Sequence, residues 1–234
     1  EVDRQLDAIG VPPDRRIVLP NGVDVTRFSP GPPEVDLRLS LGLADRFVVG
    51  WIGGFRPFHG LDLIPDLARA LRFRVPDAVL CLIGTGPLRH RVEEATRGME
   101  GIRLFPPVPR AEVPRWIRMF DACVVLAGPG PFHYSPLKLY EYMACGRPVV
   151  APSVGGITKV VRDGHQCLLV PPGDPGACAS ALARLADDHA LRSRLATAAR
   201  HAAELASWDV RAKELLQSLS LQGLSSYAGA RFRW

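Results

Sequence analysis

The stretch SPLKLYEYMACGRPVV, residues 135–150, decides the fold prediction. Pro136 fits a first helical turn, because it needs no donor there and its φ angle is already helical. Gly146 is typical of a helix end, and the apolar run that follows predicts a buried strand. The residues between them repeat with a helical period and form an apolar face made of Leu137, Leu139, Tyr140, Met143 and Ala144. A helix followed directly by a buried strand indicates an α/β protein.

Glu141 gives this helix a chemical interpretation. It lies four residues past Leu137, on the same side as the helix start. The free N–H groups and partial positive charge of a helix N-terminus suit a phosphate. A carboxylate one turn further on can accept hydrogen bonds from two ribose hydroxyls. The helix therefore points to a nucleotide, although an ordinary amphipathic helix with Glu141 at its solvent edge explains the same pattern equally well.

Composition narrows the class of protein and its partners. The 234 residues are 47% hydrophobic and 23% charged, which is typical of globular domains, and no stretch is apolar for long enough to span a membrane. The net charge of +5 favours anionic partners such as nucleotide phosphates or an acidic membrane surface. The basic residues are scattered without interleaved aromatics, so we expect no nucleic-acid partner. We expect a cytoplasmic protein, with the inner face of the membrane as a peripheral site.

Apolar runs alternate with helical patterns along most of the chain. The expected strands are 47–53, 78–83, 102–105, 122–127, 149–151 and 167–170. The expected helices besides the one above are 61–74, 88–96, 111–120, 174–186, 189–205 and 208–219. This alternation predicts a doubly wound parallel sheet, Rossmann-like, with helices on both faces. Ligands bind such sheets at the carboxyl ends of the strands, so function should collect in the turns there.

The turn GGFRPFHG, residues 53–60, follows the first strong strand. Gly53 and Gly54 allow close backbone approach, and Arg56 and His59 could meet a phosphate. The competing interpretation is a tight turn with Arg56 solvated.

A second glycine pair, Gly84 and Gly86, resembles the start of a dinucleotide fingerprint. Arg89 stands where the third glycine would be, and the next strand carries no acidic residue for a ribose. We therefore expect this turn to pack helix on strand and expect no nicotinamide cofactor.

Histidine, cysteine and tryptophan add little chemistry. The histidines show no metal-ligand spacing and there is no Asp-x-Asp, so we expect no metal. The five cysteines have no C-x-x-C pair, which favours buried, reduced thiols. We interpret Trp51, Trp116 and Trp208 as core or interdomain packing in preference to ligand stacking.

The motifs, taken in order, resemble a known family over about residues 16–220. PNGVD, 20–24, with Phe28 and Pro30, resembles an interdomain linker; residues 48–63 and 82–89 resemble the first two strands and turns of a donor domain; residues 135–152 resemble the signature helix. Together they resemble the C-terminal, donor-binding half of a family 4 (group 1) retaining glycosyltransferase of GT-B fold. The resemblance implies three parts: residues 1–30, the end of an N-terminal domain and the linker; 31–206, the donor-binding domain; and 207–234, a C-terminal helix and tail. Because the chain begins at Glu1 within a helical pattern, we expect a fragment whose N-terminal, acceptor-binding domain is missing.

The same resemblance implies roles for individual residues. The base would lie on the loop of Phe105 and Val108, and the ribose on Glu141. The diphosphate would lie on the turn and the helix start, formed by Gly53, Gly54, Arg56, His59, Ser135, Leu137 and Lys138. Arg56, His59 and His133 are the implied catalytic residues, their charge stabilising the departing nucleotide diphosphate. The implied reaction transfers a sugar from a UDP-, GDP- or ADP-sugar to a glycan or lipid-linked acceptor, with retention and without cofactor or metal.

Three positions depart from the family pattern. Gly54 and His59 stand where the family has an Arg and a Lys that clamp the diphosphate, and His133 replaces the first signature glutamate. These changes keep a second hypothesis open, in which the chain is a non-catalytic nucleotide-sugar-binding module or a degenerate partner subunit.

Overall fold

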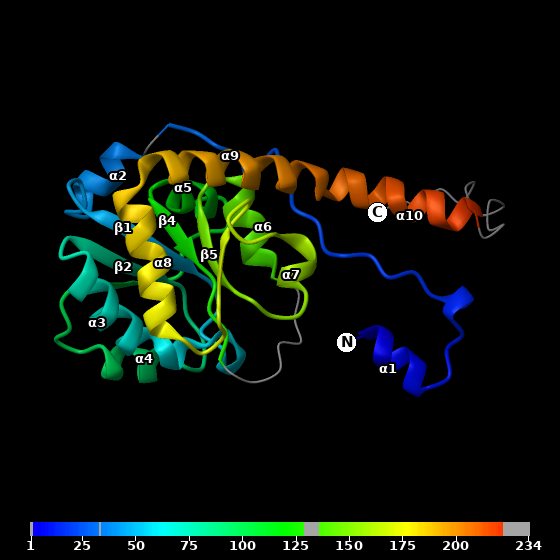
Figure 1. The fold of residues 1–234 in the computed structure, drawn as a ribbon, viewed down its shortest axis with the longest axis horizontal. Coiled ribbons are helices and arrows are strands. Elements are labelled where there is room, and N and C mark those ends of the chain that lie inside the picture. Colours follow the sequence, from blue (N-terminus) through cyan, green and yellow to red (C-terminus); the bar gives the residue numbers. More distant parts are fainter. Residues whose placement is uncertain (1, 33, 129–135, 222–234) are drawn as a thin grey trace.

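The computed structural model describes residues 2–32, 34–128 and 136–221, and it confirms the predicted fold class (Figure 1). Six strands form one parallel sheet in the order β3-β2-β1-β4-β5-β6. The strands are β1 Phe47–Ile52, β2 Ala78–Ile83, β3 Ile102–Phe105, β4 Ala122–Val124, β5 Val149–Pro152 and β6 Leu168–Val170. This is the strand order of the dinucleotide-binding folds, with the order reversing between β1 and β4.

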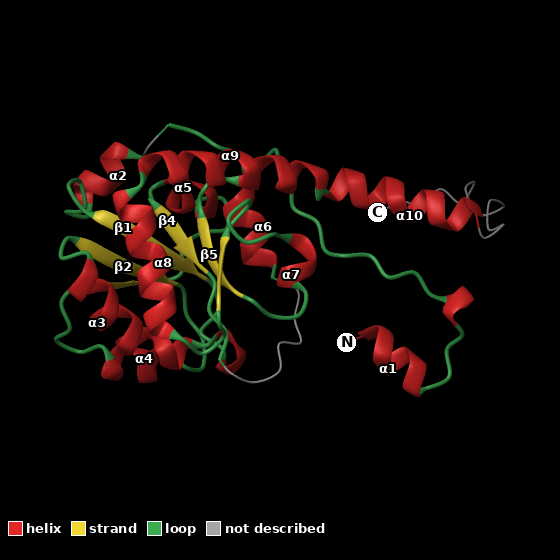
Figure 2. Cartoon of the chain, in the orientation of Figure 1, coloured by secondary structure: helices red, strands yellow, loops and turns green. Residues whose placement is uncertain are grey.

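Helices cover both faces of the sheet (Figure 2). The α-helices of the described residues are α1 Val2–Ala8, α2 Val35–Ser40, α3 Ile64–Arg74, α4 Arg89–Ala95, α5 Val113–Arg118, α6 Leu137–Ala144, α7 Ile157–Val160, α8 Pro175–Asp187, α9 His189–Leu205 and α10 Trp208–Leu221. Of these, α1 and α10 extend away from the sheet (Figure 1). The helix expected over 61–74 opens with a 3₁₀ turn, Leu61–Leu63, and its α-helical part starts at Ile64 with Pro65 in the first turn, where a missing N–H costs nothing. The strand expected over 122–127 ends at Val124.

The alternation of side chains along the strands divides the core into two layers. Val48 and Cys81 point to the face that packs against α6 and α9, whereas Val49 and Leu80 point to the face that packs against α3 and α8. Each fully buried Leu or Val side chain contributes about 1.5–3 kcal/mol relative to an exposed one. The two layers therefore hold α6 against the sheet from one side while α3 and α8 close the other.

The segment that resembles an interdomain linker is partly fixed to the domain. Val23 and Phe28 are buried in the same layer as α6, and the Val23 amide donates to the Ala206 carbonyl at 3.1 Å. The Trp208 amide in turn donates to the Val23 carbonyl at 3.1 Å. The proposed boundaries at 30/31 and 206/207 stay predictions. In the described ranges, no helix is both long and apolar enough to cross a membrane.

Candidate functional site

Helix α6 is fixed to the carboxyl end of β1. The Tyr142 hydroxyl is buried and accepts a hydrogen bond from the Ile52 amide, at the last residue of β1, at 2.8 Å. Lys138, one turn earlier on α6, then lies directly over the next residue of the chain, because a Cβ added to Gly53 would be 3.2 Å from Lys138 Cε. Tyr142 was missed from the sequence, because it lies outside the apolar face predicted for this helix.

The turn after β1 and the start of α6 meet through one pair of side chains. The Lys138 ammonium lies 3.1 Å from His59 Nε2, and His59 Nδ1 lies 2.5 Å from the Gly54 carbonyl oxygen. An ammonium can only donate and a carbonyl can only accept, so Nδ1 carries the imidazole proton and Nε2 accepts from Lys138. This arrangement requires a neutral ring.

The surroundings of His59 keep that ring neutral at pH 7. Burial lowers the pKa of His59 to about 4, with further lowering by the charges of Lys138 and Arg56 and an opposing effect of the Gly54 carbonyl. The family resemblance implied a stabilising charge on His59, whereas the burial of the ring favours its neutral form. Arg56, at the exposed rim of the turn, and Lys138 are the cations whose charges lower the pKa of His59.

Lys138 itself sits in a confined position. Its ammonium lies 5.2 Å from the centre of the Trp51 ring, an attractive cation–π geometry. Burial lowers the pKa of Lys138 to about 8, although the charge of Glu141 opposes this shift. Lys138 is therefore mostly charged at pH 7 and lies close to its titration range.

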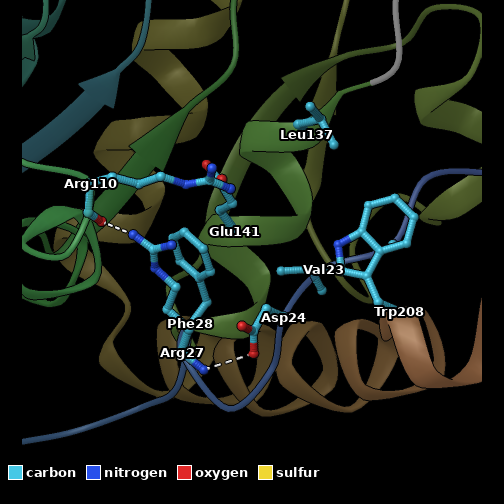
Figure 3. A pocket seen from close by; sticks show the side chains of 9 residues that line it. Val23, Asp24, Arg27, Phe28, Arg110, Leu137, Glu141 and Trp208 are labelled. Carbon is cyan, nitrogen blue, oxygen red and sulfur yellow. Dashed lines mark hydrogen bonds between the residues drawn. The ribbon is translucent and has the colours of Figure 1, made fainter. Parts of the chain in front are cut away.

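Glu141 faces a separate pocket of about 160 Å³ (Figure 3). Arg110 extends toward Glu141 from the loop after β3, and the Arg27 guanidinium donates a hydrogen bond to the Arg110 carbonyl. Burial raises the pKa of Glu141, and the charges of Lys138, Arg110 and Arg27 partly offset that rise. The pocket is lined by Gly22, Val23, Asp24, Arg27, Phe28, Arg110, Leu137, Glu141 and Trp208.

Arg27 was missed from the sequence, because it lies in the linker-like segment, where no spacing rule pointed to it. Trp208 was interpreted as core or interdomain packing. It is 50% exposed and lines the pocket, so it is not a core residue, and its interdomain packing stays a prediction; Trp51 is fully buried as expected. The cause is the bond between the Trp208 and Val23 backbones, which brings the start of α10 beside the linker-like segment.

A second pocket, of about 240 Å³, lies over the glycine turns at the ends of β1 and β2. The glycine turns and the loop after β3 line it together, through Gly53, Gly54, Gly84, Thr85, Pro107 and Val108. Three prolines in the loop 105–110 have no N–H group, so Val108 and Arg110 carry the amides after the strand. The Phe105 ring packs edge-on against Trp116 with 5.1 Å between ring centres. The loop thus presents a small apolar wall with few backbone donors.

The Gly84–Gly86 turn has a structural role, in agreement with the prediction. A Cβ on Gly84 would lie 2.0 Å from the Gly53 carbonyl oxygen, so only glycine permits this approach of two turns. Arg89 donates to the carbonyls of Gly84 at 2.7 Å and Phe105 at 2.6 Å. The arginine that stands in place of a third glycine therefore ties the ends of β2 and β3 together.

The structure brings most of the predicted residues to one edge of the sheet. Gly53, Gly54, Arg56, His59 and Lys138 lie together, Val108 faces the two glycines, and Leu137 and Glu141 face the neighbouring pocket. The first amide to bond within α6 is that of Leu139, to Pro136, so the Leu137 and Lys138 amides precede the helical ladder. His133 and Ser135 lie outside the described residues. In the part of the chain that the structure describes, no group of three or more His, Cys, Asp or Glu is placed to hold a metal.

Comparison with solved structures agrees with this architecture. The chain superposes on Anabaena HepE, solved with UDP and glucose, with a TM-score of 0.79 at 22% identity, covering 93% of this chain and 60% of HepE. Sucrose-phosphate synthase from Thermosynechococcus elongatus gives a TM-score of 0.74 at 27% identity, covering 96% of this chain and 57% of the synthase. Both are glycosyltransferases of GT-B fold.

Comparison with curated sequences gives relatives named D-inositol 3-phosphate glycosyltransferase. The protein from Salinispora tropica is 33% identical over 229 residues, 90% of this chain and 47% of the relative. The protein from Frankia alni is 34% identical over 229 residues, 91% of this chain and 54% of the relative. The chain thus spans about half the length of the curated relatives it matches. The family described as glycosyl transferases group 1 matches residues 46–188, and the chain belongs to that family.

Proposed function

We propose that this chain binds the nucleotide-diphosphate sugar donor of a retaining glycosyltransferase. The observation that carries the proposal is the meeting of α6 with the turn after β1, which puts Lys138, His59 and Glu141 at the carboxyl edge of the sheet. Open α/β sheets bind their ligands at this edge, beside the reversal of strand order. HepE, which shares the fold, was solved with UDP and glucose, so UDP is the first nucleotide to test, ahead of GDP and ADP.

Each part of the donor has a matching group in the proposal. Val108 and the loop around Phe105 would hold the base by apolar contact and backbone bonds. Glu141 would accept hydrogen bonds from the ribose hydroxyls, because its carboxylate faces an open pocket. The amides of Leu137 and Lys138, the Lys138 ammonium and Arg56 would surround the diphosphate over Gly53 and Gly54.

The proposed reaction is sugar transfer with retention at the anomeric carbon. Cationic groups and helix amides stabilise the negative charge that develops on the departing nucleotide diphosphate, which is the dominant electrostatic task in such a transfer. The proposal includes no protein nucleophile and no metal. A separate N-terminal domain would bind the acceptor, a glycan or lipid-linked glycan. The name shared by the curated relatives adds D-inositol 3-phosphate as an acceptor to test.

A second candidate function is a nucleotide-sugar-binding module without turnover. The neutral state of His59 favours it, because the ring adds no positive charge beside Lys138 and Arg56. Donor turnover in the two-domain protein separates the candidates. Nucleotide binding without transfer to any acceptor would support the module.

Calorimetric titration with UDP, GDP and ADP tests the donor-binding proposal. We expect one nucleotide to bind with a micromolar to low-millimolar Kd, and Glu141→Ala to weaken it about tenfold, because two hydroxyl bonds to a carboxylate are lost. Glu100→Ala is the matched control, since Glu100 is exposed and precedes β3, at the amino ends of the strands and away from the proposed site. Binding of none of the three nucleotides, or equal affinities of the two variants, would contradict the proposal.

A further inference from the structure

Lys138 of α6 brings a positive charge to the glycine turn that follows β1. It projects from the first turn of α6 across the glycine turn, with Cε 3.2 Å and Nζ 3.4 Å from where a Gly53 Cβ would be. Glycine leaves room for this approach, since a Cβ at position 53 would push the end of the lysine side chain by a few tenths of an ångström. The turn itself supplies Gly54 and the neutral His59.

His59 is bonded in a way that suits an acceptor. Its Nδ1–H is held by the Gly54 carbonyl at 2.5 Å, and its ring meets Trp51 edge-on with 5.6 Å between centres. Both contacts fix the direction of the Nε2 lone pair, which receives the Lys138 ammonium at 3.1 Å. A protonated ring would set two donors against each other at that distance.

We propose that Lys138 is the cation that binds the donor diphosphate and that His59 is a positioning residue, a neutral hydrogen-bond acceptor that holds the ammonium over Gly53. This inference rests on the proposed function and divides the roles within that site. Among the described residues, His59 Nε2 is the hydrogen-bond partner of the Lys138 ammonium, which leaves two of its N–H groups for phosphate oxygens. The positive charge of the site thus comes from the helix and its orientation from the turn.

The first test compares the affinity for UDP with that for UMP, by calorimetry on the 234-residue chain. We expect Lys138→Met to weaken UDP about tenfold or more and UMP much less, because a charge-assisted bond to the diphosphate is lost. Lys159→Met is the matched control, since Lys159 is an exposed lysine on α7, and it should change neither affinity by more than about twofold. Equal UDP affinity in Lys138→Met and the unmodified chain would overturn the inference while leaving donor binding intact. Binding of no nucleotide would overturn both.

The second test separates positioning by His59 from a charge on His59. His59→Gln places an acceptor near the position of Nε2, whereas His59→Leu has none, so we expect His59→Leu to weaken UDP several-fold and His59→Gln clearly less. The ratio of the Kd values of His59→Leu and the unmodified chain cancels the titration of the nucleotide itself. A ratio that stays constant from pH 7.5 to 5.5 fits a neutral acceptor. A ratio that grows toward low pH, or equal losses in both variants, would overturn the positioning role.

The third test needs no variant and so remains valid if a substitution prevents folding. The charged and titratable groups around Lys138 are His59 and Arg56 from the turn and Glu141 from its own helix. With Lys138 titrating at a pKa of about 8, UDP affinity should fall about tenfold between pH 7 and 9. A flat profile over this range would contradict Lys138 as the diphosphate cation.

Discussion

Two glycine turns lie side by side at the carboxyl edge of the sheet, and their polar groups are used differently. In the Gly84–Gly86 turn, which we call the supporting turn, the Thr85 carbonyl accepts from the Phe55 amide at 2.9 Å, and Arg89 donates to the carbonyls of Gly84 and Phe105. Both turns line the same pocket, but the turn of Gly53 and Gly54, which we call the open turn, has His59 and Lys138 bonded to each other beside it. The cation of the supporting turn thus bonds backbone carbonyls, whereas the cation beside the open turn bonds a side chain and lies over Gly53.

The largest effect on stability should come from adding a side chain to the supporting turn at Gly84. Gly84 has φ +135°, and the Cβ of Gly84→Ala would lie 2.0 Å from the Gly53 carbonyl oxygen, a backbone atom that cannot move away cheaply. We expect the free energy of unfolding to fall by about 3–4 kcal/mol or more, measured by urea denaturation followed by circular dichroism. Gly98→Ala is the matched control, because Gly98 also has a positive φ, +74°, but a Cβ added there would meet no other atom within 4 Å. This substitution should cost about 1 kcal/mol. Equal losses would mean that backbone conformation, not the contact between turns, makes glycine necessary at Gly84.

The next effect compares the removal of two cations, Arg89 and Lys138, on stability and on UDP affinity. Arg89→Met removes two bonds to backbone carbonyls and should lower the free energy of unfolding by about 1.5–3 kcal/mol, because the carbonyls lose a charged partner. Lys138→Met should leave stability nearly unchanged, because burying the ammonium already lowers its pKa. UDP affinity should follow the opposite order, with a loss only in Lys138→Met. Chemical denaturation measures the loss of stability and calorimetry the loss of UDP affinity, on the same samples. A loss of UDP affinity in folded Arg89→Met would show that the two turns do not differ in their roles.

The sequence predicted the sheet, the helices and most of the edge residues, because hydrophobic period and glycine placement are local signals. Strand β2 was predicted with the bounds it has in the structure, since a run of apolar residues can be seen without a structure. The missing third glycine pointed to a structural turn, but the bonds that Arg89 makes there were not predicted. Three features could not be predicted without the fold: the neutral state of His59 and the positions of Trp208 and Arg27 in the pocket of Glu141. Each depends on a partner distant in the chain, Lys138 lying 79 residues from His59. A charge state cannot be read from residue type when burial and a distant cation decide it.

A smaller effect tests how the open turn is held to α6. Tyr142→Phe removes the hydroxyl that accepts from the Ile52 amide and leaves a buried N–H without that partner. We expect the free energy of unfolding to fall by about 1–2 kcal/mol and UDP affinity to fall severalfold, because Lys138 moves with its helix. Tyr140→Phe is the comparison on the same helix, since the buried Tyr140 has Arg211 of α10, and not β1, as the hydrogen-bond partner of its hydroxyl among the described residues. Equal losses of UDP affinity in the two variants would show that the bond to Ile52 does not set the position of α6.

The smallest effect is a pH dependence of stability caused by His59 in the open turn. His59 has a pKa of about 4 in the folded chain, against an ordinary value of 6.5. Between these values the unfolded chain binds a proton that the folded chain does not, so the contribution of His59 is complete above pH 6.5 and is lost as the pH falls toward 4. Because the imidazole is only half-buried, we expect the loss to be on the order of 1 kcal/mol, seen as a lower Tm at pH 4.5 than at pH 7. His59→Gln does not titrate and should show a shallower fall, so the difference between the two profiles isolates the histidine. Parallel profiles would show that the ring is protonated in the folded chain without cost, and the acceptor geometry toward Lys138 would then be wrong.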